Sequence, residues 1–173
     1  FLDGTVAPRA PDQLLDGKLI GPALPTFSGG WDNTFKYKGF DLNILLFFSG
    51  GNYIYNGTKA GLRDQRNWNN STEVLNRWQR PGDVTNIPRL VANDNVSNGS
   101  AIVISENVEK GDFIKCRNIA LGYNIKKAWA EKLGISSIRL YGSAQNLFTL
   151  TNYSGFDPEV STTGNANANP SVD

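Results

Sequence analysis

The stretch from Phe113 to Leu150 constrains the fold most, because two long runs of alternating residues flank one short helical pattern. In the second run, apolar or small residues occupy every other position and polar residues occupy most positions between them. The first set is Ile138, Leu140, Gly142, Ala144 and Phe148, and the second is Ser137, Arg139, Tyr141, Ser143 and Gln145. A period of two predicts a half-buried β-strand with one apolar and one polar face.

The first run and the connection complete a strand, helical turn and strand over 113–150. Ile119, Leu121 and Tyr123 alternate with small or polar residues, which predicts another strand. Helix-forming residues fill 126–133 and stop at Gly134, a residue type that often follows the last turn of a helix. Both strands exceed the usual length of about 5–6 residues. A strand that crosses a membrane at a tilt needs about 9–11.

A second pair of strands precedes this pattern. Residues 27–37 and 40–49 alternate, and Lys38-Gly39 between them predicts a tight turn, so 27–49 forms a hairpin. One side of the hairpin is apolar, with aromatic residues near its ends. Such a side either packs against a core, as in a soluble β-sandwich, or faces lipid, as in a transmembrane barrel. Alternation alone favours the sandwich, because soluble sheets are commoner.

Two segments, 50–112 and 151–173, lack strand periodicity and are predicted to be long loops. Loops longer than about 12–15 residues are often functional. Within the first, residues 70–73 resemble a capping box and predict a short helix through Arg80, ended by Pro81-Gly82. Leu75 and Trp78 share a face of that helix, so Trp78 is expected to pack the loop together.

Composition removes several classes of function. The 17 basic and 16 acidic residues nearly balance, so nothing points to nucleic acid. The chain has no histidine, which removes the usual parts of zinc sites and of Ser-His or Cys-His catalysis. The single cysteine, Cys116, cannot form an intrachain disulfide. We therefore expect no catalytic residue, no metal, no cofactor and no enzymatic activity.

Membrane and targeting signals leave the location open. The sequence does not begin with Met and shows no signal peptide, which suggests a mature or excised segment. Its longest apolar run, Ile44 to Phe48, is far shorter than a spanning helix. Barrels cross a membrane with alternating strands instead, so this shortage does not exclude one.

Several short motifs, in one order from Ile20 to Glu159, together resemble the C-terminal part of the SusC/RagA family of TonB-dependent outer-membrane transporters. They are Ile20-Gly-Pro-Ala-Leu-Pro25, Phe35-Lys-Tyr-Lys-Gly-Phe-Asp-Leu42, Gly50-Gly-Asn-Tyr-Ile-Tyr-Asn56, Arg77-Trp-Gln-Arg-Pro-Gly-Asp83, Ile87-Pro-Arg89, Phe113-Ile-Lys-Cys-Arg-Asn-Ile-Ala-Leu-Gly-Tyr123, Gln145-Asn-Leu-Phe-Thr149 and Tyr153-Ser-Gly-Phe-Asp-Pro-Glu159. The resemblance implies an all-β fold, with about four long antiparallel strands of a larger transmembrane barrel. That family's barrel closes with roughly 22 strands around a plug, so the chain resembles a fragment.

The resemblance also implies a function for the intact protein in the bacterial outer membrane. Such a transporter imports oligosaccharides or peptides with a SusD-like lipoprotein lid, and is powered by TonB through a segment absent here. The implied partners are the rest of the barrel, that lipoprotein, TonB, a glycan or peptide substrate and membrane lipid. The alternative from a different class is a soluble extracellular β-sandwich that binds carbohydrate.

Topology follows from the same resemblance. The connections at 38–39 and 126–134 would be periplasmic, and 50–112 and 151–173 would be outer loops, since short periplasmic turns and long outer loops are the barrel norm. Lipid would face Leu42, Ile44, Leu46, Ile119, Leu121, Ile138 and Leu140. The lumen would face Arg139, Tyr141, Ser143 and Gln145. Substrate or partner binding is assigned to Trp68, Arg77, Trp78, Arg80, Tyr153 and Asp157.

Overall fold

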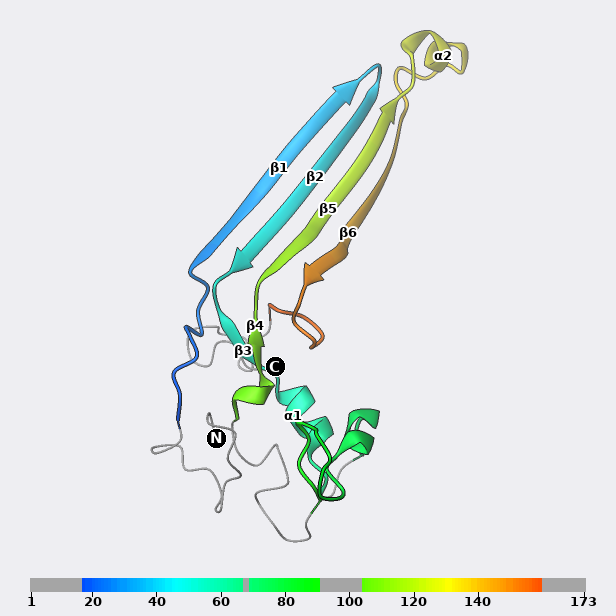
Figure 1. The fold of residues 1–173 in the computed structure, drawn as a ribbon. Coiled ribbons are helices and arrows are strands. Elements are labelled where there is room, and N and C mark those ends of the chain that lie inside the picture. The colour runs from blue at the N-terminus through cyan, green and yellow to red at the C-terminus, as the bar shows by residue number, and fades with distance from the viewer. Residues whose placement is uncertain (1–16, 67–68, 91–103, 160–173) are drawn as a thin grey trace. The chain divides into compact units, whose positions relative to one another are not determined.

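The computed structural model describes residues 17–66, 69–90 and 104–159. These fall into two compact units (Figure 1). The sheet unit consists of residues 25–51 and 111–152, and the loop unit consists of the described parts of 1–24, 52–110 and 153–173.

The sheet unit is one antiparallel sheet of four long strands in the order β1-β2-β5-β6 (Figure 1). The strands are β1 (Phe27–Tyr37), β2 (Phe40–Gly50), β5 (Phe113–Asn124) and β6 (Arg139–Thr151). All four predicted strands are confirmed, because each has the long alternating pattern that a sheet with two unlike faces requires. Both outer strands of this sheet, β1 and β6, have one open edge among the described residues.

Two short connections join neighbouring strands at the same end of the sheet. Between β1 and β2, Lys38 (φ 46°) and Gly39 (φ 92°) both have positive φ, as a two-residue type I′ turn requires. Between β5 and β6 lies α2 (Lys127–Lys132). Past its end Gly134 has φ 72°, its amide donates to Glu131, and the next amide donates to Ala130. This is a Schellman motif, which stops the helix as Gly134 predicted.

The register gives the sheet one apolar face and one mainly polar face. Residues directly paired across neighbouring strands share a face. The apolar face carries Phe27, Trp31, Phe35, Tyr37, Phe40, Leu42, Ile44, Leu46, Phe48, Ile114, Cys116, Ile119, Leu121, Tyr123, Leu140, Ala144, Phe148 and Leu150. The opposite face, called the polar face below, carries Asp32, Thr34, Asp41, Asn43, Asn118, Arg139, Tyr141, Ser143 and Gln145, with Leu45, Phe47 and Phe113 toward the end away from α2.

A β-bulge in β5 keeps the charged residues of this strand off the apolar face. Leu45 pairs with Asn118 and the next residue of β2 pairs with Cys116, so Arg117 is the extra residue. Before the bulge the even-numbered residues of β5 lie on the apolar face, and after it the odd-numbered ones do. Unbroken alternation would have placed the charged Lys115 among the apolar side chains. The bulge instead places it on the polar face.

The loop unit contains several short elements, and apart from a helix near 72–76 the sequence did not indicate them. They are β3 (Tyr53–Tyr55), paired antiparallel with β4 (Val108–Lys110), and α1 (Gly57–Arg63), with the 3₁₀ helices η1 (Thr72–Asn76) and η2 (Ser105–Asn107). The absence of strands from 50–112 was therefore a wrong prediction. No helix in the described part of the chain is long and apolar enough to cross a membrane.

The predicted capping-box helix through Arg80 is also wrong. Only η1 forms there, and the Ser71 side chain makes no cap hydrogen bond. The carboxylate that would complete the capping box, Glu73, instead pairs with Arg63 of α1 at 2.8 Å. The chain then becomes extended at Arg77 (ψ 154°), which ends the helical geometry.

Candidate functional site

The centre of the polar face is a hydrogen-bonded ladder built on Asn43 of β2. Its side-chain amide donates to Asp32 Oδ1 at 2.7 Å and to Thr34 Oγ1 at 3.1 Å, both on β1. Its Oδ1 accepts from the Asn118 amide of β5 at 3.2 Å. Three strands are thus linked by side chains that can also present hydrogen-bonding groups to water or a solute.

Charge lies on the same face near the end that carries α2. Arg139 of β6 forms an ion pair with Asp41 of β2, which bridges across β5. The Asn124 amide also donates to the Asp41 carboxylate at 3.4 Å. The Arg139 guanidinium lies 5.6 Å from the centroid of the Tyr141 ring. Gly122 permits this arrangement, because a Cβ there would lie 2.5 Å from the Arg139 guanidinium and 2.7 Å from the Asp41 carboxylate.

Aromatic rings and cations occupy the other end of the polar face. The rings of Phe47 and Phe113 lie 5.8 Å apart. The Arg117 guanidinium lies 4.3 Å from the Phe47 centroid, and the Lys115 ammonium lies 5.8 Å from the Phe113 centroid. Cations over ring faces are attracted by the ring quadrupole. This end therefore combines aromatic rings with positive charge, although Phe113 and Lys115 are themselves buried there.

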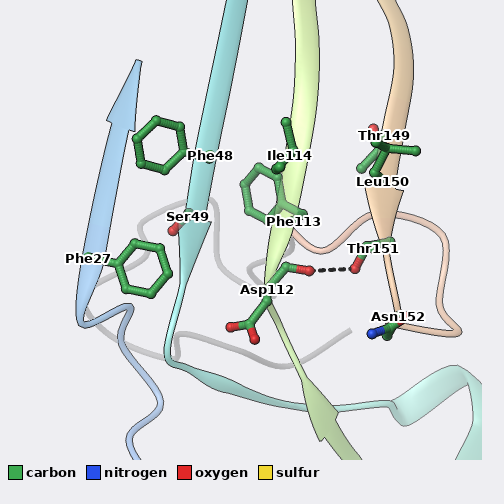
Figure 2. A pocket seen from close by; sticks show the side chains of 10 residues that line it. All are labelled: Phe27, Phe48, Ser49, Asp112, Phe113, Ile114, Thr149, Leu150, Thr151 and Asn152. Atoms are coloured by element: carbon green, nitrogen blue, oxygen red, sulfur yellow. Dashed lines mark hydrogen bonds between the residues drawn. The ribbon is translucent and has the colours of Figure 1, made fainter. Parts of the chain in front are cut away.

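The apolar face ends in aromatic side chains at both extremes. Next to the short connections, Phe40 and Tyr123 lie 4.4 Å apart between ring centroids. At the other extreme a shallow hollow includes Phe27 and Phe48, as Figure 2 shows, and the Thr151 hydroxyl donates to the Asp112 carbonyl at 2.8 Å. Most of these rings are exposed, with Phe27 57% and Phe40 49% accessible. Aromatic side chains at both ends of an apolar band are typical of strands that cross a membrane.

The strand length fits the same interpretation. At about 3.3 Å per residue the 11 residues of β1 span roughly 36 Å. A tilt of about 40° reduces that span to about 28 Å along the membrane normal, close to the apolar band of about 25 Å in outer-membrane barrels. Soluble strands of this length are uncommon.

Within the loop unit, Glu109 of β4 is held by several donors. Lys59 of α1 forms an ion pair with it at 2.8 Å, and both the amide and the hydroxyl of Ser154 donate to its oxygens at 2.8 Å. The side-chain amide of Asn56 donates to the same hydroxyl at 3.0 Å. The side-chain Oδ1 of Asn56 accepts from the backbone amide of Lys59 and so caps α1. Burial raises the pKa of Glu109, but these hydrogen bonds outweigh burial and hold that pKa below its ordinary value.

Glu109, Lys59, Ser154 and Asn56 together form a clamp, which fixes the segment that follows β6. Tyr153 is buried, and its ring lies over Gly155, where a Cβ would approach the ring to 2.4 Å. Phe156 beside it is 91% exposed. The clamp therefore orders a turn whose most prominent side chain is an exposed aromatic ring.

The binding residues predicted from the sequence lie in two separate places. Trp68 lies outside the described residues. Arg77, Trp78 and Arg80 follow η1: Trp78 is half-buried, bonds Ile87 through its backbone and lies 5.9 Å from Arg89, and Arg80 is exposed beside Asp83. Tyr153 and Asp157 belong to the clamped segment, where the Asp157 carboxylate accepts from the Glu159 amide at 2.9 Å. Leu75, expected to pack with Trp78, is 66% exposed.

The clamp itself was missed by sequence reasoning. Glu109 lies in 50–112, which was predicted to be a loop, and its partner Ser154 lies 45 residues further along the chain. The only local signal was Asn56, a preferred residue type at the start of a helix. Among the described residues no group of three acidic, histidine or cysteine side chains could hold a metal ion.

Comparison with known proteins gives these surfaces a context. No protein-family model matches the chain. TonB-dependent receptor P39 of Formosa agariphila is 36% identical over 160 residues, which cover 90% of this chain and 15% of that receptor. TonB-dependent receptor SusC of Bacteroides thetaiotaomicron is 28% identical over 155 residues, which cover 82% of this chain and 13% of the receptor. The chain thus spans only a small part of these relatives.

Solved structures agree on the fold. A chain of the RagAB peptide importer in its closed-closed state matches with a TM-score of 0.72 at 22% identity, over 92% of this chain and 17% of that chain. The four long strands of this chain form an open single-layer sheet, and the match extends over nearly the whole chain. The fold is therefore not the β-sandwich of the alternative prediction. The chain is a segment of a transmembrane β-barrel of the bacterial outer membrane and belongs to the TonB-dependent receptor family that includes SusC.

Proposed function

We propose that this chain forms part of the wall and outer loops of a receptor that imports nutrients across the outer membrane. Its apolar face meets lipid and its polar face lines the lumen. The observation that carries this proposal is the register, which gathers the apolar side chains on one face and the ladder around Asn43 on the other. In an open sheet such a division needs two different surroundings, since lipid accepts no exposed charges.

The loop unit is the extracellular part in this proposal. Residues 50–112 and 151–173 are outer loops, and the connections at 38–39 and 126–134 are periplasmic, because barrels keep their short turns on that side. The polar face, with Arg139, Tyr141, Ser143 and Gln145, borders the route of an oligosaccharide or peptide. Stacking rings and hydrogen-bonding side chains suit either substrate.

Two partners complete the proposal. A SusD-like lipoprotein covers the outer loops, where Arg77, Trp78 and Arg80 present basic and aromatic side chains. The segment from Tyr153 to Asp157 adds the exposed ring of Phe156. TonB supplies the energy by acting on a part of the receptor outside these residues. Support for both comes from the relatives, which carry TonB in their names and include SusC.

Cysteine labelling of the full-length receptor in its own membrane tests the two faces. Ser143 and Ala144 are consecutive residues of β6 on opposite faces, so they form a matched pair at one depth. In a Cys116→Ala background, Ser143→Cys should react with a small water-soluble maleimide. Ala144→Cys should react only with a lipid-soluble reagent. Equal reactivity of both positions toward the water-soluble reagent would contradict the assignment of faces.

Uptake measurements test the transport role. Cells that carry the receptor should accumulate fluorescent oligosaccharides or peptides, and cells without it should not. Loss of TonB should abolish accumulation while surface binding persists. Uptake that is independent of both the receptor and TonB would overturn the proposal.

A further inference from the structure

Apolar side chains continue past the ends of β5 and β6, at the end of the sheet where α2 lies. The last pair of the ladder is Asn124 with Arg139. One residue further, the Ile125 amide donates to the Ile138 carbonyl at 2.9 Å, which extends the pairing. Because side chains alternate along a strand, Ile125 and Ile138 lie on the same face as Tyr123, the apolar one.

The short helix α2 adds to this apolar surface. Trp129 and Leu133 are four residues apart and lie on one side of the helix. They line a single, mainly apolar hollow with Ile125 and Ile138. Trp129 is 68% and Leu133 70% exposed, whereas Ala130 is fully buried. The helix therefore packs its small residue against the protein and turns its large apolar residues outward, in line with the apolar face of the sheet.

Lysines border the same surface. Lys126, Lys127 and Lys132 surround the helix, and Lys132 lines the hollow itself. Lys127 has an ion-pair partner one turn away in Glu131, at 3.6 Å. Lys126 and Lys132 have no ion-pair partner among the residues that the structure describes. Two long cationic side chains are thus available beside an exposed tryptophan and leucine.

We propose that α2 is an interfacial anchor that lies in the phospholipid headgroup layer on the periplasmic side of the membrane. Trp129 and Leu133 reach the boundary of the acyl chains, and Lys126 and Lys132 contact lipid phosphates. Tryptophan and lysine favour this layer, since each has an apolar body and a polar end. The proposal rests on the proposed function, because α2 meets lipid only if the apolar face does.

Lipid explains these features better than a protein partner does. The hollow is continuous with a sheet face that already meets lipid in the proposed function, and the lysines stand where that apolar surface ends. Anionic phosphates complement the two lysines, and acyl chains complement the tryptophan and leucine. One kind of surrounding, the edge of a bilayer, supplies both.

Depth-dependent fluorescence quenching in the full-length receptor tests the anchor. The receptor is reconstituted in vesicles of phosphatidylethanolamine and phosphatidylglycerol, with the lipids brominated either near the headgroup or near the chain end. A bimane label is placed at Leu133→Cys in a background without other reactive cysteines. Ser137→Cys, exposed in the same connection, is the matched control, and Leu121→Cys on the apolar face reports the proposed function.

The three labels separate the two proposals. Several-fold stronger quenching at position 133 than at 137 by the shallow bromolipid, with position 121 quenched by the deep bromolipid, supports the anchor. Quenching at 121 without quenching at 133 would overturn the anchor and leave the proposed function standing. No quenching at 121 would overturn both. A double variant, Lys126→Gln with Lys132→Gln, tests the role of the lysines and should reduce quenching at position 133. Unchanged quenching would show that the two lysines do not contact lipid phosphate.

Discussion

The guanidinium of Arg117 lies 4.3 Å from the centroid of the Phe47 ring, across neighbouring strands and on the polar face. Arg117 is the extra residue of the bulge in β5. The arginine therefore gains a partner on the side of the sheet where charge is tolerated. Whether replacing Arg117 lowers or raises the free energy of unfolding therefore tests that placement.

Replacing Arg117 by leucine should lower the free energy of unfolding by about 0.5–1 kcal/mol, because the cation–ring attraction is lost. If the arginine faced lipid, the same change would raise stability by up to about 2–4 kcal/mol near the midplane. Denaturant unfolding of the full-length receptor in lipid vesicles shows whether the free energy of unfolding falls or rises. An increase in stability would contradict the placement of Arg117.

Ala144→Arg should destabilise the barrel much more than Ser143→Arg. Near the middle of the band the first should destabilise the barrel by about 2–4 kcal/mol, and the second, on the polar face, by less than about 1 kcal/mol. The same unfolding measurement compares them. Leu140→Arg should cost only about 0–1 kcal/mol, because Leu140 lies close to α2 at the end of the band. Similar costs for Ala144 and Ser143 would be inconsistent with two unlike faces.

The clamp on Glu109 should loosen in acid. Its pKa is lower in the folded protein than its ordinary value of 4.5, so the clamp stabilises the fold fully above about pH 4.5. That contribution is lost as the pH falls through the folded pKa. Hydrogen-exchange protection of the Ser154 amide should be constant from pH 7 to 5 and then decrease. Glu109→Gln should remove most of this pH dependence, and a variant with an unchanged profile would show that another group is responsible.

Trp78→Ala should loosen the loop after η1, since it removes a half-buried ring that lies beside the Arg89 guanidinium. Limited proteolysis within 50–112 should become faster, and Trp78→Phe should restore part of the resistance because it keeps an aromatic ring. If cleavage is unchanged while binding of the lipoprotein partner is lost, Trp78 contributes to that contact instead.

The chain on its own should not be a stable monomer in water. Both β1 and β6 have an open edge among the described residues, and most large side chains of the apolar face are exposed. Unpaired strand edges promote association. Residues 1–173 expressed alone should therefore aggregate or require detergent, as size-exclusion chromatography would show. A cooperatively unfolding monomer without detergent would argue against a barrel segment.

The long strands could be predicted because their information is local. Each has enough alternation to define two faces, and Lys38-Gly39 and Gly134 mark the turns between them. The bulge could not be predicted in the same way. Lys115 and Arg117 fit the phase set by Cys116 but not the phase set by Ile119, and only pairing with β2 shows which residue is the extra one.

The loop unit was predicted poorly for a different reason. Its strands have three residues each, too few for periodicity, and α1 contains Gly57 and Gly61, which weaken a helical pattern. The burial of Glu109 depends on Lys59 and Ser154, which are distant in sequence. Such elements arise from tertiary contacts that a single sequence does not reveal.

The bulge at Arg117 also has a consequence for how this gene can change length. Within a regular part of these strands, a single-codon insertion would exchange the apolar and polar faces of every residue between it and the next turn. At Arg117 the ladder already accommodates one extra residue on β5 opposite two on β6. Codon gains and losses tolerated within these strands should therefore be concentrated at Arg117 and at the facing residues Asn146 and Leu147.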